Sequence, residues 1–289
     1  MIIAHTIGEV RQHISAAKRD GKKVGFVPTM GSLHDGHLSL IELSSTLSDF
    51  QVMSIFVNKM QFNDLKDYET YPREFQRDCD LAAAAGIDLI FSPDDSEMYD
   101  SPLTYVDMDI LTENLCGAHR PGHFKGVFTV VSKLFNIVQP DIAVFGQKDI
   151  QQVIGISKMV ADLNFPVAII IGKIFREDTG LAMSSRNKHL SETQKTDAIS
   201  LYRSLQKAEE MISRGECSAD IICSAMKDII ESGNADAIDY ISCVNYHSLQ
   251  PTDRITGKSV IAVAVYYGTT RLIDNMIIDK TDKGFVCIY

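Results

Sequence analysis

A turn that carries two histidines offers the clearest chemistry in this sequence. Residues 28–38 read Pro-Thr-Met-Gly-Ser-Leu-His-Asp-Gly-His-Leu, and they lead from a short apolar run into a pattern of helical spacing. A glycine-bearing turn at a helix N-terminus offers free N–H groups and the positive end of the helix dipole to phosphate. His34 and His37 are three residues apart, so both imidazoles can face one ligand and donate hydrogen bonds to it. The turn is therefore predicted to bind phosphate; the alternative, a zinc pair, lacks a third ligand candidate nearby in the sequence.

A glutamine follows the next predicted strand. Gln61 lies in the segment Phe56–Asn63, and Tyr71-Pro72-Arg73 comes shortly after it. A side-chain amide is both donor and acceptor, so Gln61 could bind a hydroxyl and a carboxylate together. An ordinary polar loop residue is the alternative.

Residues 145–152 repeat the pattern of a strand that ends in glycine and opens a helix. They read Phe-Gly-Gln-Lys-Asp-Ile-Gln-Gln. Lys148 is a mobile point charge suited to phosphate. Asp149 can cap the helix or hold a ribose hydroxyl, and Gln152 would point back toward the same pocket. A solvated helix start is the alternative.

Two further segments are rich in possible anion ligands. In residues 176–187, Ser184 and Ser185 precede Arg186, whose guanidinium can bind phosphate oxygens in a bidentate fork. A loop there could close over ATP, although it could also be a plain polar connection between domains. In His119–Phe124, Arg120 or His123 could contact leaving pyrophosphate, but a structural loop and helix cap is the favoured interpretation.

Two familiar phosphate-binding motifs are absent. Thr256-Gly257-Lys258-Ser259 resembles the end of a P-loop, but Thr252 stands where the first glycine belongs. No G-x-G-x-x-G follows a predicted strand, so the dinucleotide fingerprint is missing as well.

Strands and helices alternate through the first 175 residues. Strands are predicted at 25–29, 51–57, 88–91, 141–145 and 167–171, and helices at 38–47, 72–85, 124–138 and 149–163. Pro72 suits the first turn of its helix and Gly86 suits the end. Continuous apolar strands separated by helices indicate a parallel sheet covered on both faces. The fold class is therefore α/β, a doubly wound Rossmann-like sheet that binds ligands at the carboxyl ends of its strands.

The pattern changes after about residue 187. Helices are predicted at about 191–213 and 217–231, followed by strands at 237–246, 260–267 and 271–278, with a hairpin connection at 268–270. Helices followed by antiparallel strands suggest a smaller α+β domain. We therefore expect a first domain at 1–175 and a second at 176–289.

Composition narrows the function classes. The 289 residues have a formal net charge of −10, which argues against broad nucleic-acid binding but allows a local basic pocket. No apolar run approaches the roughly 18 residues of a membrane span, and no signal-peptide pattern opens the sequence, so a cytoplasmic protein is expected. None of the six cysteines forms a C-x-x-C pair, and reduced thiols are expected.

Taken together, the motifs resemble one family, the pantothenate synthetases. The segments that carry the resemblance occur in the family's order and span roughly residues 26–187. They are PTMGSLHDGH (28–37), FVNKMQF (56–62), YPR (71–73), HRPGHFKGV (119–127), VQPDIAVFGQKDIQQ (138–152) and GLAMSSRN (180–187). This combination is much more specific than the H-x-G-H element alone, which nucleotidylyltransferases and class I aminoacyl-tRNA synthetases share.

The resemblance implies an ATP-dependent ligase that joins pantoate to β-alanine through an acyl-adenylate, with magnesium, a C-terminal lid domain and a homodimer. The catalytic residues it implies are His34, His37, Lys148 and Arg186. The ATP-binding set it implies is Met30, Gly31, Ser32, Leu33, His34, Asp35, Gly36, His37, Gly146, Gln147, Lys148, Asp149, Phe175, Met183, Ser184, Ser185 and Arg186. Gln61 and Gln152 would bind pantoate, and Gln61 also β-alanine. No magnesium ligand is identified, and Asp78 is only a candidate.

This sequence departs from the family's pattern at several positions. Lys59 stands where proline is usual, Gln147 where glutamate is usual and Thr179 where aspartate is usual, and residues 64–67 lack the usual Glu-Asp pair. None of these positions belongs to the predicted catalytic set. A nucleotidylyltransferase of the same superfamily and a non-catalytic nucleotide-binding regulator remain the alternatives. An aminoacyl-tRNA synthetase is disfavoured by the acidic balance and by the lack of room for an anticodon domain.

Overall fold

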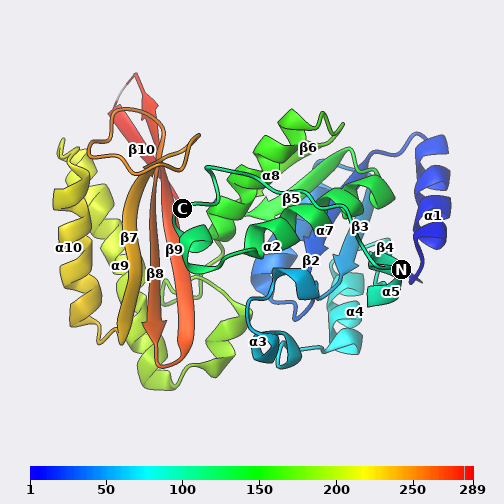
Figure 1. Cartoon of the computed structure of the whole chain (residues 1–289), viewed down its shortest axis with the longest axis horizontal. Helices are drawn as coiled ribbons and strands as arrows, with labels where there is room; N and C mark the ends of the chain where they lie inside the picture. The colour runs from blue at the N-terminus through cyan, green and yellow to red at the C-terminus, as the bar shows by residue number, and fades with distance from the viewer. Residues whose placement is uncertain (283) are drawn as a thin grey trace. The chain divides into compact units, whose positions relative to one another are not determined.

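Two sheets organise the chain, and each belongs to a separate structural unit (Figure 1). The computed structural model describes residues 1–282 and 284–289. Unit 1 comprises Met1–Met108, Arg120–Gly146 and Gly155–Gly172, and unit 2 comprises Asp109–His119, Gln147–Ile154 and Lys173–Tyr289. Two short segments from the middle of the sequence thus belong with the C-terminal residues.

The sheet of unit 1 has six strands, all parallel, in the order β1-β4-β3-β2-β5-β6. Their bounds are β1 Ile2–Ala4, β2 Val24–Thr29, β3 Phe50–Ile55, β4 Leu89–Phe91, β5 Ile142–Gly146 and β6 Ala168–Gly172. Every residue of β3 and β4 is buried, as expected for a parallel sheet covered on both faces. The predicted doubly wound α/β class is confirmed.

The helices around this sheet begin and end as their sequences dictate. They are α1 Ile7–Arg19, α2 Asp35–Ser45, α3 Leu65–Glu69, α4 Phe75–Ala84, α5 Asp95–Met98, α7 His123–Val138 and α8 Ile150–Asp162. At α1, the Thr6 side chain accepts from the Glu9 N–H and the Glu9 side chain accepts from the Thr6 N–H, which is a capping box. After α4, Gly86 adopts φ +86°, the left-handed conformation that ends many helices.

The strand order places a topological switch point between β2 and β5. From β2 the chain moves to β3 and β4 on one side, and later returns to β5 and β6 on the other. Ligands of open α/β sheets bind outside the carboxyl ends of the strands at such a point. The chain leaves β2 after Thr29 and β5 after Gly146, so the histidine turn and the Lys148 segment each begin there.

Unit 2 contains an antiparallel sheet of four strands in the order β10-β9-β8-β7. Its strands are β7 Ala237–Asn245, β8 Ser259–Tyr267, β9 Thr270–Thr281 and β10 Gly284–Ile288, and its helices include α6 Cys116–His119, α9 Glu192–Ser213 and α10 Ala219–Ser232. In Figure 1, α9 and α10 lie along one face of this sheet. Their apolar residues, such as Leu201, Leu205 and Ile222, form a core with Val263 and Met276 of the strands.

Two predicted helix starts are wrong by three residues. The helix predicted from Leu38 begins at Asp35, because His34 is its N-cap and the first turn is polar, so the apolar spacing starts only later. The helix predicted from Pro72 begins at Phe75, three residues later, because the Arg73 guanidinium donates to the carbonyls of Tyr68, Glu69 and Tyr71 and holds that stretch as a loop after α3.

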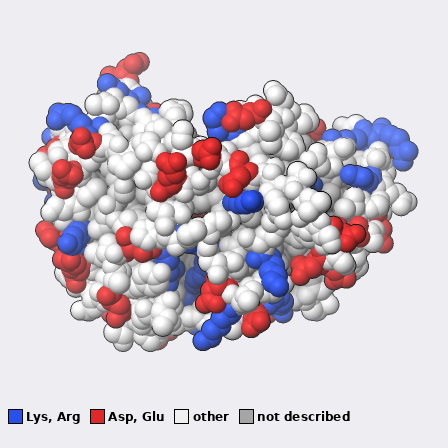
Figure 2. Space-filling model, viewed as in Figure 1, with Lys and Arg blue, Asp and Glu red and all other residues white. Residues whose placement is uncertain are grey.

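Among the described residues, no helix is long and apolar enough to cross a membrane. Acidic and basic side chains are interspersed over most of the face that Figure 2 shows.

Candidate active site

The turn after β2 is strained and is held by a buried carboxylate. Gly31 has φ +81° and Ser32 has φ +52°, a conformation that costs a non-glycine residue about 1 kcal/mol or more. The two oxygens of Asp78, a residue of α4 that is 1% exposed, accept the backbone N–H groups of Ser32 and Leu33 at 2.8 Å each. A Cβ on Gly31 would lie 2.9 Å from Asp78 Oδ2, so glycine is required for this approach.

The two histidines stand at the N-terminus of α2, as predicted. His34 is the N-cap residue with extended backbone, and its ring centroid lies 4.1 Å from that of His37. The backbone N–H of His34 donates to Nδ1 of His37 over 3.4 Å. An imidazole at the N-terminus of a helix can donate hydrogen bonds to an anionic oxygen, so this position suits a phosphate ligand. Both side chains are partly exposed, as a ligand-binding pair must be.

Gln61 is 9% exposed in the short 3-10 helix η1, Lys59–Gln61, which follows β3. Its Oε1 accepts from Nδ2 of Asn58 at 3.1 Å, and its Nε2 donates to the sulfur of Met30 at 2.9 Å. A thioether is a weak acceptor, so a substrate oxygen would be a better partner for this amide. Burial raises the pKa of Tyr99, whose protonated hydroxyl donates to Asn58 Oδ1 at 3.0 Å.

Arg120 and His123 hold the backbone of this glutamine. Nδ1 of His123 donates to the Gln61 carbonyl at 2.7 Å, and Nη2 of Arg120 donates to the same oxygen at 3.3 Å. Nη1 of Arg120 lies 3.1 Å from Nε2 of His123, which fits a neutral ring with its proton on Nδ1. Gly126 lets α7 approach η1 closely, since a Cβ there would lie 2.5 Å from the Met60 carbonyl oxygen. The favoured structural interpretation of residues 119–124 therefore fits the geometry of His123, which is 8% exposed.

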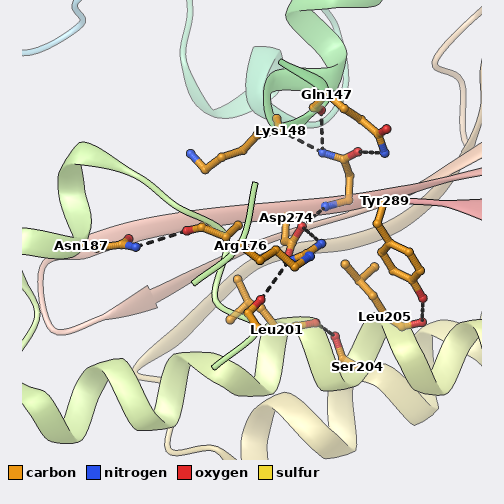
Figure 3. Close-up of polar contacts among 12 residues, drawn as sticks. Gln147, Lys148, Arg176, Asn187, Leu201, Ser204, Leu205, Asp274 and Tyr289 are labelled. Atoms are coloured by element: carbon orange, nitrogen blue, oxygen red, sulfur yellow. Dashed lines mark hydrogen bonds and ion pairs between the residues drawn. The ribbon is translucent and has the colours of Figure 1, made fainter. Parts of the chain in front are cut away.

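In unit 2, the Lys148 segment forms a second 3-10 helix, η2 Gln147–Asp149, directly before α8. Gln147 is 2% exposed, and its Nε2 donates to the carbonyl of Ile288 at 2.8 Å. Asn275 of β9 donates to the carbonyls of Gln147 and Lys148 at 3.0 and 2.9 Å (Figure 3). Gln152 is partly exposed on the first turn of α8.

The segment 173–187 forms a loop with internal bonds. Arg176 and Ala182 pair as an isolated β-bridge, and the N–H of Met183 donates to the carbonyl of Phe175. Ser184 caps the 3-10 helix η3, Ser185–His189, by accepting the N–H of Arg186 at 3.3 Å. Phe175 is 40% exposed. Because the Ser184 hydroxyl only accepts in this contact, its proton can still be donated to a ligand.

The described residues do not form a metal cage. No group of three or more His, Cys, Asp or Glu side chains among residues 1–282 and 284–289 could hold a metal ion. Asp78, the only candidate from the sequence, uses both oxygens for backbone N–H groups. We therefore give Asp78 a structural role and assign no magnesium ligand.

Some residues that support the Gln61, Lys148 and Arg176 segments lacked a recognisable sequence signal. Asn58 and Asp274 are buried polar residues whose partners are distant in sequence. Only as a pair did Asp274 and Asn275 carry a weak signal, since they lie between Leu272 and Ile273 on one side and Met276 to Ile278 on the other. Such a pair in a buried strand indicates that each side chain has a specific partner.

The parallel sheet, its switch point and the histidine turn define an α/β protein of the nucleotide-binding class. The family model described as pantoate-beta-alanine ligase matches residues 2–277. A pantothenate synthetase from Thermoanaerobacter sp. (strain X514) is 51% identical over 278 residues, which cover 96% of this chain and 98% of that protein.

Solved structures agree with this match. The crystal structure of pantothenate synthetase from Thermus thermophilus has a TM-score of 0.89 and 40% identity, covering 95% of this chain and 98% of that one. The pantoate-beta-alanine ligase of Francisella tularensis, crystallised with beta-gamma ATP and beta-alanine, has a TM-score of 0.77 and 35% identity, covering 95% and 97%. This chain belongs to the pantoate-β-alanine ligase family, which makes it a ligase.

Proposed function

We propose that this chain condenses pantoate with β-alanine, using ATP, by way of a pantoyl-adenylate. The observation that carries the proposal is the family match over nearly the whole chain, in which the histidine turn, Lys148 and the 180–187 segment are all retained. The Francisella relative was crystallised with an ATP compound and β-alanine, which fits these substrates.

The residues of unit 1 would bind the triphosphate and pantoate. The N–H groups at the start of α2 and the imidazole of His37 suit phosphate oxygens. His34 would share that role. The Gln61 amide, now bonded to a thioether, would bind pantoate and later the β-alanine carboxylate. Met30, Gly36 and Gly146 would line the nucleotide with the rest of the predicted set.

The residues of unit 2 would neutralise the charge of the leaving pyrophosphate and contact the substrates. Lys148 supplies a mobile ammonium and Arg186 a bidentate guanidinium. The hydroxyls of Ser184 and Ser185 can donate to phosphate oxygens. Gln152 would bind pantoate, and the exposed Phe175 would contact the nucleotide.

The chemistry asks for positioning and charge neutralisation rather than for a protein nucleophile. A pantoate carboxylate oxygen attacks the α-phosphorus of ATP, the bond to the β-phosphate oxygen breaks and pyrophosphate leaves. The neutral amine of β-alanine then attacks the acyl carbon, loses a proton, and AMP leaves with the former carboxylate oxygen. The mixed anhydride hydrolyses readily, so water must be kept out; we assign this to the 176–187 loop and the C-terminal domain as a lid.

Three further points belong to the proposal. Magnesium would arrive with ATP as a counter-ion of its phosphates, since Mg²⁺ is commonly held by substrate phosphates together with few protein ligands. The protein would act as a homodimer. It would work in the cytoplasm without nucleic-acid or membrane partners.

The test is AMP and pyrophosphate release by the purified protein with magnesium and ATP, adding pantoate and β-alanine separately and together. AMP only with both acids supports the proposal. Pyrophosphate without AMP would indicate a nucleotidylyltransferase, and ATP binding without turnover a regulator. Lys148→Ala should abolish most of the activity, whereas Lys158→Ala, which removes an exposed lysine of α8 paired with Asp162, should not.

A further inference from the structure

Two consecutive polar residues are buried in the middle of β9. Asp274 is 2% exposed and Asn275 is 1% exposed, although the residues that follow them, Met276 to Ile278, are apolar and buried. Burying a polar group is costly unless it is hydrogen-bonded, and the cost is larger for a carboxylate. The bonds that these two side chains make therefore identify what this part of β9 holds in place.

Asn275 holds the peptide groups on both sides of the Lys148 Cα atom. Its Nδ2 donates to the carbonyl of Gln147 at 3.0 Å and to the carbonyl of Lys148 at 2.9 Å, which uses both amide hydrogens. Because the two peptide planes that flank one Cα atom are fixed, its φ and ψ angles are fixed as well. The direction in which the Lys148 side chain leaves the backbone then follows.

Asp274 holds the base of the 176–187 loop, which carries Arg186, the second cation predicted to bind phosphate. Its Oδ2 accepts from Nη1 of Arg176 at 2.6 Å and its Oδ1 accepts from Nη2 at 3.0 Å, a bidentate pair with Arg176 only 12% exposed. Nη1 of Arg176 also donates to the carbonyl of Gly180 at 3.1 Å, inside the same loop. The guanidinium lies 4.1 Å from the ring centroid of Tyr202 on α9. Arg176 is thus fixed on several sides at the base of the loop that leads to Arg186.

The contacts of Asp274 and Asn275 are also joined to each other. The backbone N–H of Asn275 donates to Oδ1 of Asp274 at 2.8 Å. Nε2 of Gln147 lies 3.4 Å from Oδ1 of Asn275 and donates to the Ile288 carbonyl of β10, so the network continues into the neighbouring strand. Segments from two distant parts of the sequence are therefore tied to adjacent residues of one strand.

We propose that Asp274 and Asn275 are positioning residues, which set Lys148 and the Arg186 loop at a fixed spacing for the triphosphate of ATP. This inference rests on the proposed function, because it assigns the phosphate contacts to those two cations. Neither β9 residue needs to touch substrate. The alternative is that the network only stabilises unit 2, since breaking a buried pair is destabilising whatever the function.

The first test compares Asn275→Asp with wild type in pantoate-dependent exchange between ATP and labelled pyrophosphate. An aspartate cannot donate, so both carbonyls lose their donor and face a carboxylate. We expect kcat to fall by about 30- to 100-fold, the scale of a displacement of roughly 1 Å at a reacting group. Asn136→Asp is the matched control, because that amide also donates to a backbone carbonyl but is exposed on α7; it should stay within about twofold.

A second comparison tests Asp274. Asp274→Asn should lower kcat by a similar factor, whereas Asp239→Asn, which weakens the Arg271 ion pair on the same sheet, should not. Comparable loss of activity in both variants at comparable loss of melting temperature would mean that the network is only structural.

The decisive test is a double-mutant cycle with Lys148→Ala. If Asn275 acts through Lys148, adding Asn275→Ala to Lys148→Ala should lower kcat by less than about threefold, although Asn275→Ala alone lowers it tenfold or more. If the two losses of kcat multiply in the double variant, the inference is overturned. If Asn275→Asp does not fold, Asn275→Ser, which keeps one donor, should still lose about tenfold in kcat, and a loss below threefold would likewise overturn it. Inactive wild type would instead count against the proposed function itself.

Discussion

The clamp on the histidine turn gives the sharpest prediction of stability. Asp78 is 1% exposed and accepts the N–H groups of Ser32 and Leu33, both at 2.8 Å. A hydrogen bond to a charged group contributes about 1.5–3 kcal/mol, and buried donors left without a partner lose the whole of it. Asp78→Ala should therefore cost about 3–5 kcal/mol of unfolding free energy, a large share of the 5–15 kcal/mol typical of a protein.

Asp78→Asn separates the clamp from a role in metal binding. The amide keeps the shape of the carboxylate, but one of its two groups becomes a donor that faces a backbone N–H. We expect a loss of about 2–3 kcal/mol, because one of the two bonds is removed and two donors are brought together. Asp80→Asn is the control, since Asp80 lies on the same helix, is exposed, and accepts from the side chain of Gln76. It should change stability by less than about 0.5 kcal/mol.

The measurement combines urea unfolding with hydrogen exchange of the peptide that contains residues 28–38. The clamp predicts faster exchange at Ser32 and Leu33 in the Asp78 variants, and a lower urea midpoint, whether or not magnesium is present. If Asp78→Asn unfolds like Asp80→Asn and only its magnesium requirement rises, the structural assignment is refuted and Asp78 is a metal ligand.

Three other predictions concern single side chains. His37→Ala should lower turnover by at least about a hundredfold, the scale for losing one transition-state donor, and a smaller loss in single-turnover adenylate formation would count against that role. Gly126→Ala should raise the KM for pantoate and cost about 1–3 kcal/mol, because its Cβ would lie 2.7 Å from the Gln61 nitrogen; unchanged kinetics and stability would contradict the close packing of α7 on η1. Burial raises the pKa of Tyr267 to about 12, so the folded state keeps its proton while the unfolded state loses it above about pH 10. Stability should then fall as pH rises from 10 to 12, and the advantage of wild type over Tyr267→Phe in urea unfolding should shrink by about 3 kcal/mol; a constant difference would refute the shift.

Most of the fold could be predicted because its signals are local. The strands of the parallel sheet are continuous apolar runs, and the two long helices of unit 2 have helical spacing over 22 and 14 residues. The hairpin predicted at 268–270 joins β8 and β9 as expected. Helix α1 was not predicted although Thr6 and Glu9 form a capping box, which is a readable signal. The five-residue edge strand β10 was also not predicted.

The candidate site was predictable only in part. Residues that follow a strand and open a helix, such as His34 and Lys148, are recognisable by their position. Their supports are not, because the contacts join distant positions: Asp78 lies 46 residues from Ser32, and Asn275 lies 127 residues from Lys148. No local pattern encodes such a pairing. The predicted boundary between residues 175 and 176 stays a prediction, as do the roles of the individual site residues.

The way unit 2 is assembled constrains how the protein can be made. Its segments Asp109–His119 and Gln147–Ile154 are synthesised well before Lys173–Tyr289, and the Gln147 side chain bonds to the carbonyl of Ile288 in the last strand. The Lys148 segment therefore cannot form all of its final hydrogen bonds while that strand is still inside the ribosome. No single cut releases unit 2 intact, and a tag or truncation beside Ile288 acts directly on the partner of Gln147. Versions of the chain without a tag or truncation beside Ile288 should then fold more completely than versions that carry one.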